Sequence, residues 1–178
     1  MIATKRRAAP PSLFGEAWRY AALQSADRIL AAPPASPYTE RHPPRGQLVL
    51  RFVLPLELAK PANSTRHAAG WQMAKHREDV LAMVKTQWLQ RSPRLLDHMP
   101  LPGRPLARCI RFSSVEPDAT AAWWKTCIDV LLCPRMRGGR RIAGIGLLAD
   151  DRPSMLETRA WHEKVPRGQG FALVEVYN

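Results

Sequence analysis

The sequence predicts an α+β fold with a small mixed β-sheet and two main helices. Two observations favour it. Apolar, β-branched runs alternate with segments of helical periodicity, and the last two strand-like runs follow one another with no helix between them. The resulting order is β, α, β, α, β, β. At 178 residues, the chain has room for one domain of about 100 to 150 residues and an appendage.

Residues 1–45 are predicted to form a basic, proline-rich N-terminal extension. Three Pro-Pro pairs fix φ and remove N–H donors, which interrupts regular structure repeatedly. Between the first two pairs, Leu13, Trp18 and Ile29 fall roughly on one side of a single helix. We expect this helix to dock on the rest of the chain or on a partner.

The domain proper is expected to span residues 46–178. It opens with an apolar, β-branched run over residues 47–56, which suits a strand ended by Pro55. Residues 71–90 place apolar side chains at helical spacing and charges on the other face, so a helix is expected there. Residues 106–116 have the composition of a second strand.

Three further segments complete the predicted domain. Residues 118–132 are expected to form the second main helix, which begins near Asp118. A turn-rich segment over residues 133–141 follows it. Two strand-like runs, residues 154–165 and 171–178, are joined by a Pro-Arg-Gly-Gln-Gly turn and predict an antiparallel hairpin.

The charge balance favours a polyanionic partner. The chain has 27 Lys and Arg against 15 Asp and Glu, and its pI is about 10.6. Because cationic patches release counterions from phosphate backbones, nucleic acid is the leading candidate. An anionic membrane surface is the rival, but no apolar stretch reaches the roughly 20 residues of a spanning helix, so no membrane partner is expected.

The cysteines and the N-terminus indicate a cytoplasmic location. The three cysteines, Cys109, Cys127 and Cys133, are an odd number, and the first two lie in apolar stretches that suit small buried side chains. No apolar segment of about 7 to 15 residues follows the basic start of the chain, so a secretory signal is not expected.

Carboxylates cluster in one part of this basic chain. Residues 46–178 contain twelve Asp and Glu against twenty Lys and Arg, and five of the twelve lie between Glu116 and Asp151. Glu116 and Asp118 are two residues apart at the expected strand end, where an extended backbone would point both to the same side. On the expected helix, Asp118, Lys125 and Asp129 fall within about 40° of one another.

Gathered carboxylates suit a hard divalent cation such as Mg²⁺, which prefers oxygen ligands and offsets their repulsion. Such a metal would also meet a phosphate, with Lys125 stabilising the negative charge that develops during hydrolysis. The alternative is structural. Asp118 then caps a helix, Lys125 and Asp129 form a surface ion pair, and the loop residues Asp150 and Asp151 are solvated.

The order of these residues resembles the RusA family of Holliday junction resolvases. "EPDATAAWWKTCIDVL" followed by "GLLADDRP" is similar to the family's Asp-Pro-Asp-Asn-Leu run, its later Lys, an Asp-x-Leu and a final Gly-x-x-x-Asp-Asp. Upstream, "KPANSTRHAAGWQMAKHREDV" looks like the family's Asn-Ser-x-Arg segment and first helix. The similarity spans about residues 47 to 177.

The resemblance implies a small α+β domain that forms an intertwined homodimer and cleaves four-way DNA junctions by paired, Mg²⁺-dependent nicks. It also implies that the protein acts in the cytoplasm of a bacterial or phage-infected host cell. By position, Glu116, Asp118 and Asp151 would bind the metal, with Asp150 assisting or orienting. Lys125 would act on the transition state. The catalytic set implied is Glu116, Asp118, Lys125 and Asp151.

Two departures from the family pattern support an alternative. Glu116 stands where Asp is usual, which adds a methylene to a metal ligand, and Ala119 stands where Asn is usual, which removes an amide. The alternative is a catalytically weakened relative that binds branched DNA as an accessory or structural component. A remoter one is a metal-free DNA-binding component of a larger assembly.

Basic residues outside the carboxylate cluster are candidates for DNA contacts. The segment between the second helix and the Asp pair is longer than the family's, and its arginines predict a flexible cationic loop that contacts phosphates. The alternative is a solvated loop. Further candidates lie near the first helix and in the second-last strand. The full set is Arg66, Lys75, Arg77, Arg135, Arg137, Arg140, Arg141 and Lys164.

Overall fold

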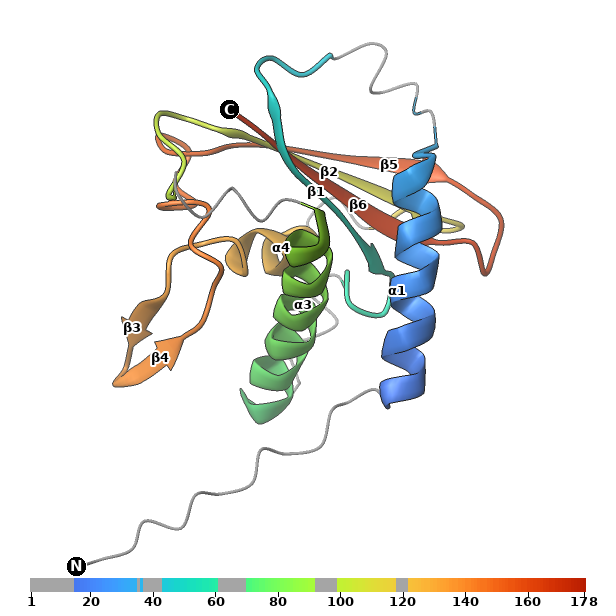
Figure 1. Ribbon diagram of the computed structural model, residues 1–178, viewed down its shortest axis with the longest axis horizontal. Helices are drawn as coiled ribbons and strands as arrows, with labels where there is room; N and C mark the ends of the chain where they lie inside the picture. Colours follow the sequence, from blue (N-terminus) through green and yellow to red (C-terminus); the bar gives the residue numbers. More distant parts are fainter. Residues whose placement is uncertain (1–14, 35, 37–42, 61–69, 92–98, 118–121) are drawn as a thin grey trace, which may run out of the picture.

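The computed structural model describes residues 15–34, 36, 43–60, 70–91, 99–117 and 122–178. Figure 1 shows the helices and strands in these ranges. In chain order they are α1 (Glu16–Ala31), β1 (Leu48–Pro55), α3 (Gly70–Arg91), β2 (Leu106–Ser113), α4 (Lys125–Asp129), β3 (Arg135–Arg137), β4 (Arg140–Ile142), β5 (Glu157–Lys164) and β6 (Phe171–Tyr177). The predicted α+β class is confirmed.

The main sheet is mixed, as predicted, with the strand order β1-β6-β2-β5. β6 runs antiparallel to both of its neighbours, and β2 and β5 are parallel. The predicted hairpin between the last two strands is wrong, because β2 lies between them. The physical reason is burial: residues 172–177 of β6 are all buried, as in an interior strand, whereas every residue of β5 is at least partly exposed, as at an edge.

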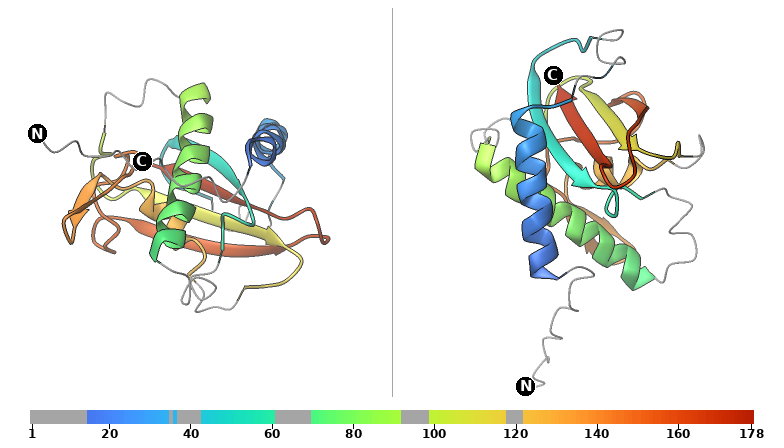
Figure 2. Two further views of the ribbon diagram at one scale, coloured as in Figure 1. Left: turned by 90° about the horizontal axis from the view of Figure 1, so that it is seen from below. Right: turned by 90° about the vertical axis from the view of Figure 1, so that its right-hand side faces the viewer.

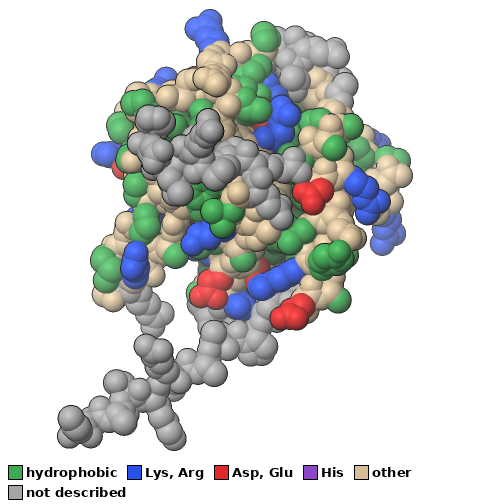
Figure 3. Space-filling view, in the orientation of Figure 1, with side chains coloured by type: hydrophobic (Ala, Val, Ile, Leu, Met, Phe, Trp, Pro, Cys, Tyr) green, Lys and Arg blue, Asp and Glu red, His purple; other side chains and the backbone are tan. Residues whose placement is uncertain are grey.

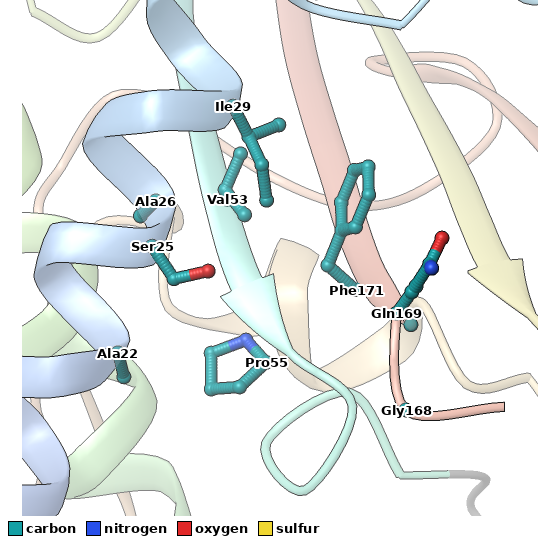
Figure 4. A pocket seen from close by; sticks show the side chains of 10 residues that line it. Ala22, Ser25, Ala26, Ile29, Val53, Pro55, Gly168, Gln169 and Phe171 are labelled. Carbon is teal, nitrogen blue, oxygen red and sulfur yellow. The ribbon is translucent and has the colours of Figure 1, made fainter.

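Both faces of the main sheet are covered. Phe52 and Val174 belong to a large core shared with α3 and α4. Val53 and Leu173 belong to a smaller core shared with α1, and Figure 4 shows Val53 of β1 next to Ile29 of this helix. Successive side chains on a strand point to opposite faces, so Phe52 and its neighbour Val53 serve the two cores.

Helix α1 docks along β1, as Figures 1 and 2 show. Ala26 and Leu30 are buried against the smaller core, and Arg19 makes an ion pair with the buried Asp79 of α3. The helix predicted inside the N-terminal extension is therefore confirmed, and it packs on the sheet. Among the described helices, none has the length and apolar character needed to cross a membrane.

The second main helix predicted over residues 118–132 is wrong in extent. α4 has 5 residues, and Ala122, three residues before its start, has a φ of 36°, which no right-handed helix accommodates. The N–H of Lys125 donates to the Ala122 carbonyl at 2.9 Å. The buried Trp123 lies in this turn, which explains the apolar periodicity without a long helix. Asp118 lies outside the described residues.

A charged row crosses the sheet on the face of the smaller core. Glu175 on β6 is in register with Arg51 on β1 and with Arg108 on β2. Its two carboxylate oxygens lie 2.6 Å from the Nη2 atoms of Arg51 and Arg108, and the Tyr177 hydroxyl donates to it at 3.0 Å. The side chains of Arg108 and Glu175 are 2% and 3% exposed, so each of these buried charges requires an opposite one.

Two cysteines are confirmed as buried side chains. Cys109 and Cys127 both belong to the large core. Burial raises the pKa of the Cys127 thiol to about 12, and it also raises the pKa of Cys109. Thiols held in the neutral form are poor nucleophiles, so these residues fill space in the core.

His76 on α3 predicts a dependence of stability on pH. Burial lowers the pKa of its imidazole below the ordinary 6.5, and Lys60 adds to this effect, against smaller opposing contributions from Asp79 and the backbone of Leu58. Below pH 6.5 the unfolded chain takes up a proton more readily than the folded one, so the free energy of unfolding should fall as the medium is acidified. Urea denaturation from pH 8 to 5 should show a steeper fall for the wild type than for His76→Gln; equal slopes would contradict this assignment.

Candidate functional site

The candidate site centres on the ammonium group of Lys125, which lies between two carboxylates. Its Nζ is 2.9 Å from Oδ1 of Asp129 and in closer contact with Oδ2 of Asp151. Burial alone would lower the pKa of Lys125, but the hydrogen bonds to Asp151 and Asp129 outweigh it and raise the pKa above the ordinary 10.5. The Lys125 side chain is 40% exposed, so this positive charge remains accessible from solvent.

Backbone hydrogen bonds bring Asp151 to Lys125 across 26 positions of sequence. The segment after α4 and the segment before Asp151 are joined by a Leu132–Leu148 bridge. The N–H of Cys133 donates to the Leu148 carbonyl at 2.9 Å, and the N–H of Leu148 donates to the Leu131 carbonyl at 3.0 Å. Leu131, Leu132 and Leu148 are buried, so the core fixes both segments and holds the Asp151 loop beside α4.

Asp150, the neighbour of Asp151, faces a different cation. Its Oδ1 accepts the backbone N–H of Arg152 at 3.1 Å, and its Oδ2 accepts the Arg152 Nε–H at 2.8 Å. The hydrogen bond from the Arg152 backbone, together with the guanidinium charge, lowers the pKa of Asp150. The two adjacent aspartates therefore have separate partners, Arg152 for Asp150 and Lys125 for Asp151.

Arg77 of α3 connects three parts of the chain around the site. Its guanidinium donates to the backbone carbonyls of Asp129 and, at 3.2 Å, Ala143, and its Nη1 lies 3.7 Å from the Asp129 carboxylate. Burial lowers the pKa of Arg77, Asp129 opposes this, and the nearby charge of Arg135 lowers it further. Arg77 therefore holds the end of α4 against the segment that leads out of β4.

The segment predicted as a flexible cationic loop is a two-stranded β-ribbon, formed by β3 and β4 and visible at the left of Figure 1. Gly138 and Gly139 at its turn have φ values of 54° and 73°. Two consecutive residues with positive φ define the type I′ turn, whose twist matches that of paired strands. The Gly-Gly sequence between runs of arginine therefore sets a defined hairpin, which corrects the prediction of a flexible loop.

The described residues do not by themselves assemble the predicted metal ligands. β2 ends at Ser113, whose hydroxyl donates to the Val115 carbonyl at 2.7 Å, so the predicted strand through Glu116 is too long. Glu116 lies beyond the strand end and is exposed. In the part of the chain that the structure describes, no three His, Cys, Asp or Glu side chains form a group that could hold a metal ion. The described carboxylates form ion pairs with Lys125 and Arg152. The hypothesis of a metal site is therefore supported by the sequence pattern alone.

The predicted DNA contacts lie in different environments. Lys75 is buried beside Glu78 at 3.5 Å, whereas Lys164 at the end of β5 is exposed. Arg135 and Arg141 are exposed on the ribbon, and Arg137 and Arg140 are the strand residues on either side of its turn. Arg66 lies outside the described residues.

Sequence reasoning missed the roles of Arg152 and Arg77 as partners of the predicted carboxylates. Arg152 follows the Asp pair directly, so its ion pair with Asp150, two residues earlier, could have been predicted from the sequence. The contact of Arg77 with Asp129 spans 52 positions and depends on how α3 and α4 pack, which no local spacing encodes.

No protein-family model matches this chain, and a search of the curated proteins finds no match.

Proposed function

We propose that this chain is a RusA-like, Mg²⁺-dependent endodeoxyribonuclease that acts as a homodimer on four-way junctions or other branched DNA. The observation that carries the proposal is the contact between Lys125 and Asp151. The two residues belong to the two separate sequence runs whose order resembles the family, and their side chains meet in the folded chain.

The chemistry of the site supports phosphodiester hydrolysis. Lys125 carries its charge at neutral pH, since the hydrogen bonds to Asp151 and Asp129 more than offset the lowering of its pKa by burial, and its exposure lets a phosphate oxygen approach. Asp151 and Asp129 orient the ammonium through hydrogen bonds, so the cation is fixed before substrate arrives. Bound Mg²⁺ would supply Lewis-acid activation of the phosphoryl group.

The proposal is tested with purified protein and a labelled synthetic four-way junction. Paired nicks are expected with Mg²⁺ and none with EDTA, and metal-free protein should regain activity on adding Mg²⁺. Tight, salt-sensitive binding without cleavage under any divalent metal would exclude the nuclease. Light scattering of the same preparation tests the homodimer.

Lys125→Met shows whether any cleavage belongs to this site. Removing the ammonium should lower cleavage at saturating junction by about 100-fold, the scale of a lost transition-state contact. Lys85→Met is the matched control, because Lys85 is an exposed residue of α3. Equal rates for both variants would place the chemistry elsewhere.

A second candidate is a branched-DNA binding protein without cleavage. Two observations favour it: Asp150 and Asp151 both make ion pairs with cations of the protein itself, and the described residues contain no group of three metal-binding side chains. This candidate predicts that junction affinity is unchanged by EDTA. It would be excluded by Mg²⁺-dependent nicks that Lys125→Met removes.

A further inference from the structure

The β3–β4 ribbon combines basic charge with exposed apolar surface. Residues 130–149 contain four arginines and no Asp or Glu. Met136 is 66% exposed, and Arg135 and Arg141 are exposed beside it. Figure 3 shows basic and hydrophobic side chains on this projecting part of the molecule. Such a surface suits a partner that is polyanionic and also offers apolar groups for contact.

The strand register sorts these residues onto two faces of the ribbon. Met136 pairs with Arg141, so these two side chains share one face. Arg135 pairs with Ile142, and Arg137 pairs with Arg140, which assigns these positions to the other face. The two faces of the ribbon therefore carry different residues, Met136 and Arg141 on one and Arg135 and Ile142 on the other.

The ribbon is also held in place relative to Lys125. Arg77 donates to the Ala143 carbonyl at the foot of β4 and contacts Asp129 of α4. The Asp129 carboxylate in turn binds Lys125. DNA bound by the ribbon would therefore lie at a fixed distance from the candidate site.

We infer that the ribbon enters the major groove of a duplex arm next to the candidate site, with Met136 and Arg141 on the face that meets the base edges. The inference rests on the proposed DNA function. A strand pair is about 5 Å between backbones and wider with its side chains, which suits a major groove about 12 Å wide and exceeds a minor groove about 6 Å wide. Three-residue strands reach about 10 Å, enough for a groove about 8.5 Å deep.

The groove contact makes specific chemical predictions. Met136 contacts the C5-methyl group of thymine, which projects only into the major groove, and Arg141 donates to acceptor atoms of base edges or phosphates. Arg135, on the other face, contacts a phosphate.

The first test compares two double variants in fluorescence-anisotropy titrations with a duplex and with a four-way junction. Arg135→Gln/Arg141→Gln should weaken binding about tenfold and reduce the slope of log affinity against log salt by up to about 2, because each lost phosphate contact is worth about 0.9. Arg104→Gln/Arg167→Gln is the control, with the same charge change at exposed positions outside the ribbon. Equal losses for both double variants would overturn the inference.

The second test identifies the groove. Replacing thymine by deoxyuridine in the duplex should weaken the wild type and leave Met136→Gln unaffected, and the minor-groove ligand netropsin should not compete. Competition by netropsin, or indifference of the wild type to the thymine methyl group, would contradict a major-groove contact. Circular dichroism checks that every variant is folded.

These outcomes separate the inference from the proposed function. If the protein cleaves DNA with Mg²⁺ but the ribbon double variant binds DNA as well as its control does, the inference about the ribbon is wrong and the proposed nuclease stands. If DNA binding depends on the ribbon but no cleavage occurs, the proposed nuclease function is wrong and the inference about the ribbon stands. Absence of DNA binding by the wild type would overturn both.

Discussion

Replacing Asp151 with asparagine is expected to lower the rate of junction cleavage at saturating DNA by about 1,000-fold, the upper end of the loss from one preorganised electrostatic contact. The change keeps the size of the side chain and removes its charge. Lys125 then loses a hydrogen-bonded carboxylate, and the proposed metal loses a ligand. Single-turnover cleavage measures the effect, and anisotropy should show that junction binding is retained.

Asp150→Asn is the matched control for this prediction. It makes the same chemical change one residue earlier, at a carboxylate that accepts from Arg152. Because this side chain lies apart from Lys125, we expect a loss of about tenfold or less, as for a supporting contact. If the two variants lost activity equally, or if Asp151→Asn kept full activity, the assignment of Asp151 would be wrong.

Replacing Glu175 with alanine is expected to destabilise the fold by about 3 to 5 kcal/mol, the cost of removing one partner from a buried ion pair. The reason is that Arg108, at 2% exposure, would keep a buried charge without its carboxylate. Urea denaturation at neutral pH measures the change.

The ion pair between Glu157 and Arg159 on β5 provides the control. Its atoms are as close, at 2.6 Å, but both side chains are 37% exposed. Glu157→Ala should therefore cost at most about 1 kcal/mol. The double variant Arg108→Met/Glu175→Leu should recover much of the loss, because apolar replacements remove both buried charges. Equal effects at Glu175 and Glu157 would show that burial does not set the cost.

The fold was predictable where local sequence decides it. Pro55 ends β1 as expected, and α3 extends the predicted helix by one residue at each end. The helix expected from Asp118 failed because apolar spacing near Trp123 reflects burial in a turn, and the left-handed backbone at Ala122 has no signal in an alanine. The hairpin failed because adjacency in sequence was taken for adjacency in the sheet. The four consecutive apolar residues at the start of β6, residues 171–174, already indicated an interior strand.

The candidate site was predictable only where its contacts are local in the sequence. The spacing of Lys125 and Asp129 encodes their ion pair, because both lie on one helix. The approach of Asp151 depends on the backbone bridge between Leu132 and Leu148, and its place in the site was expected from the order of motifs rather than from geometry. The contacts of Arg77 depend on helix packing and had no local pattern.

The position of β6 has a consequence for the order of folding. The strand that comes last in the described order, residues 171–177, lies between β1 and β2, and these two strands do not pair with each other. During synthesis, β1 must therefore wait for about 120 further residues before its sheet partner exists. Until then the unpaired N–H and C=O groups along its backbone are open to pairing with other chains, which is a route to aggregation.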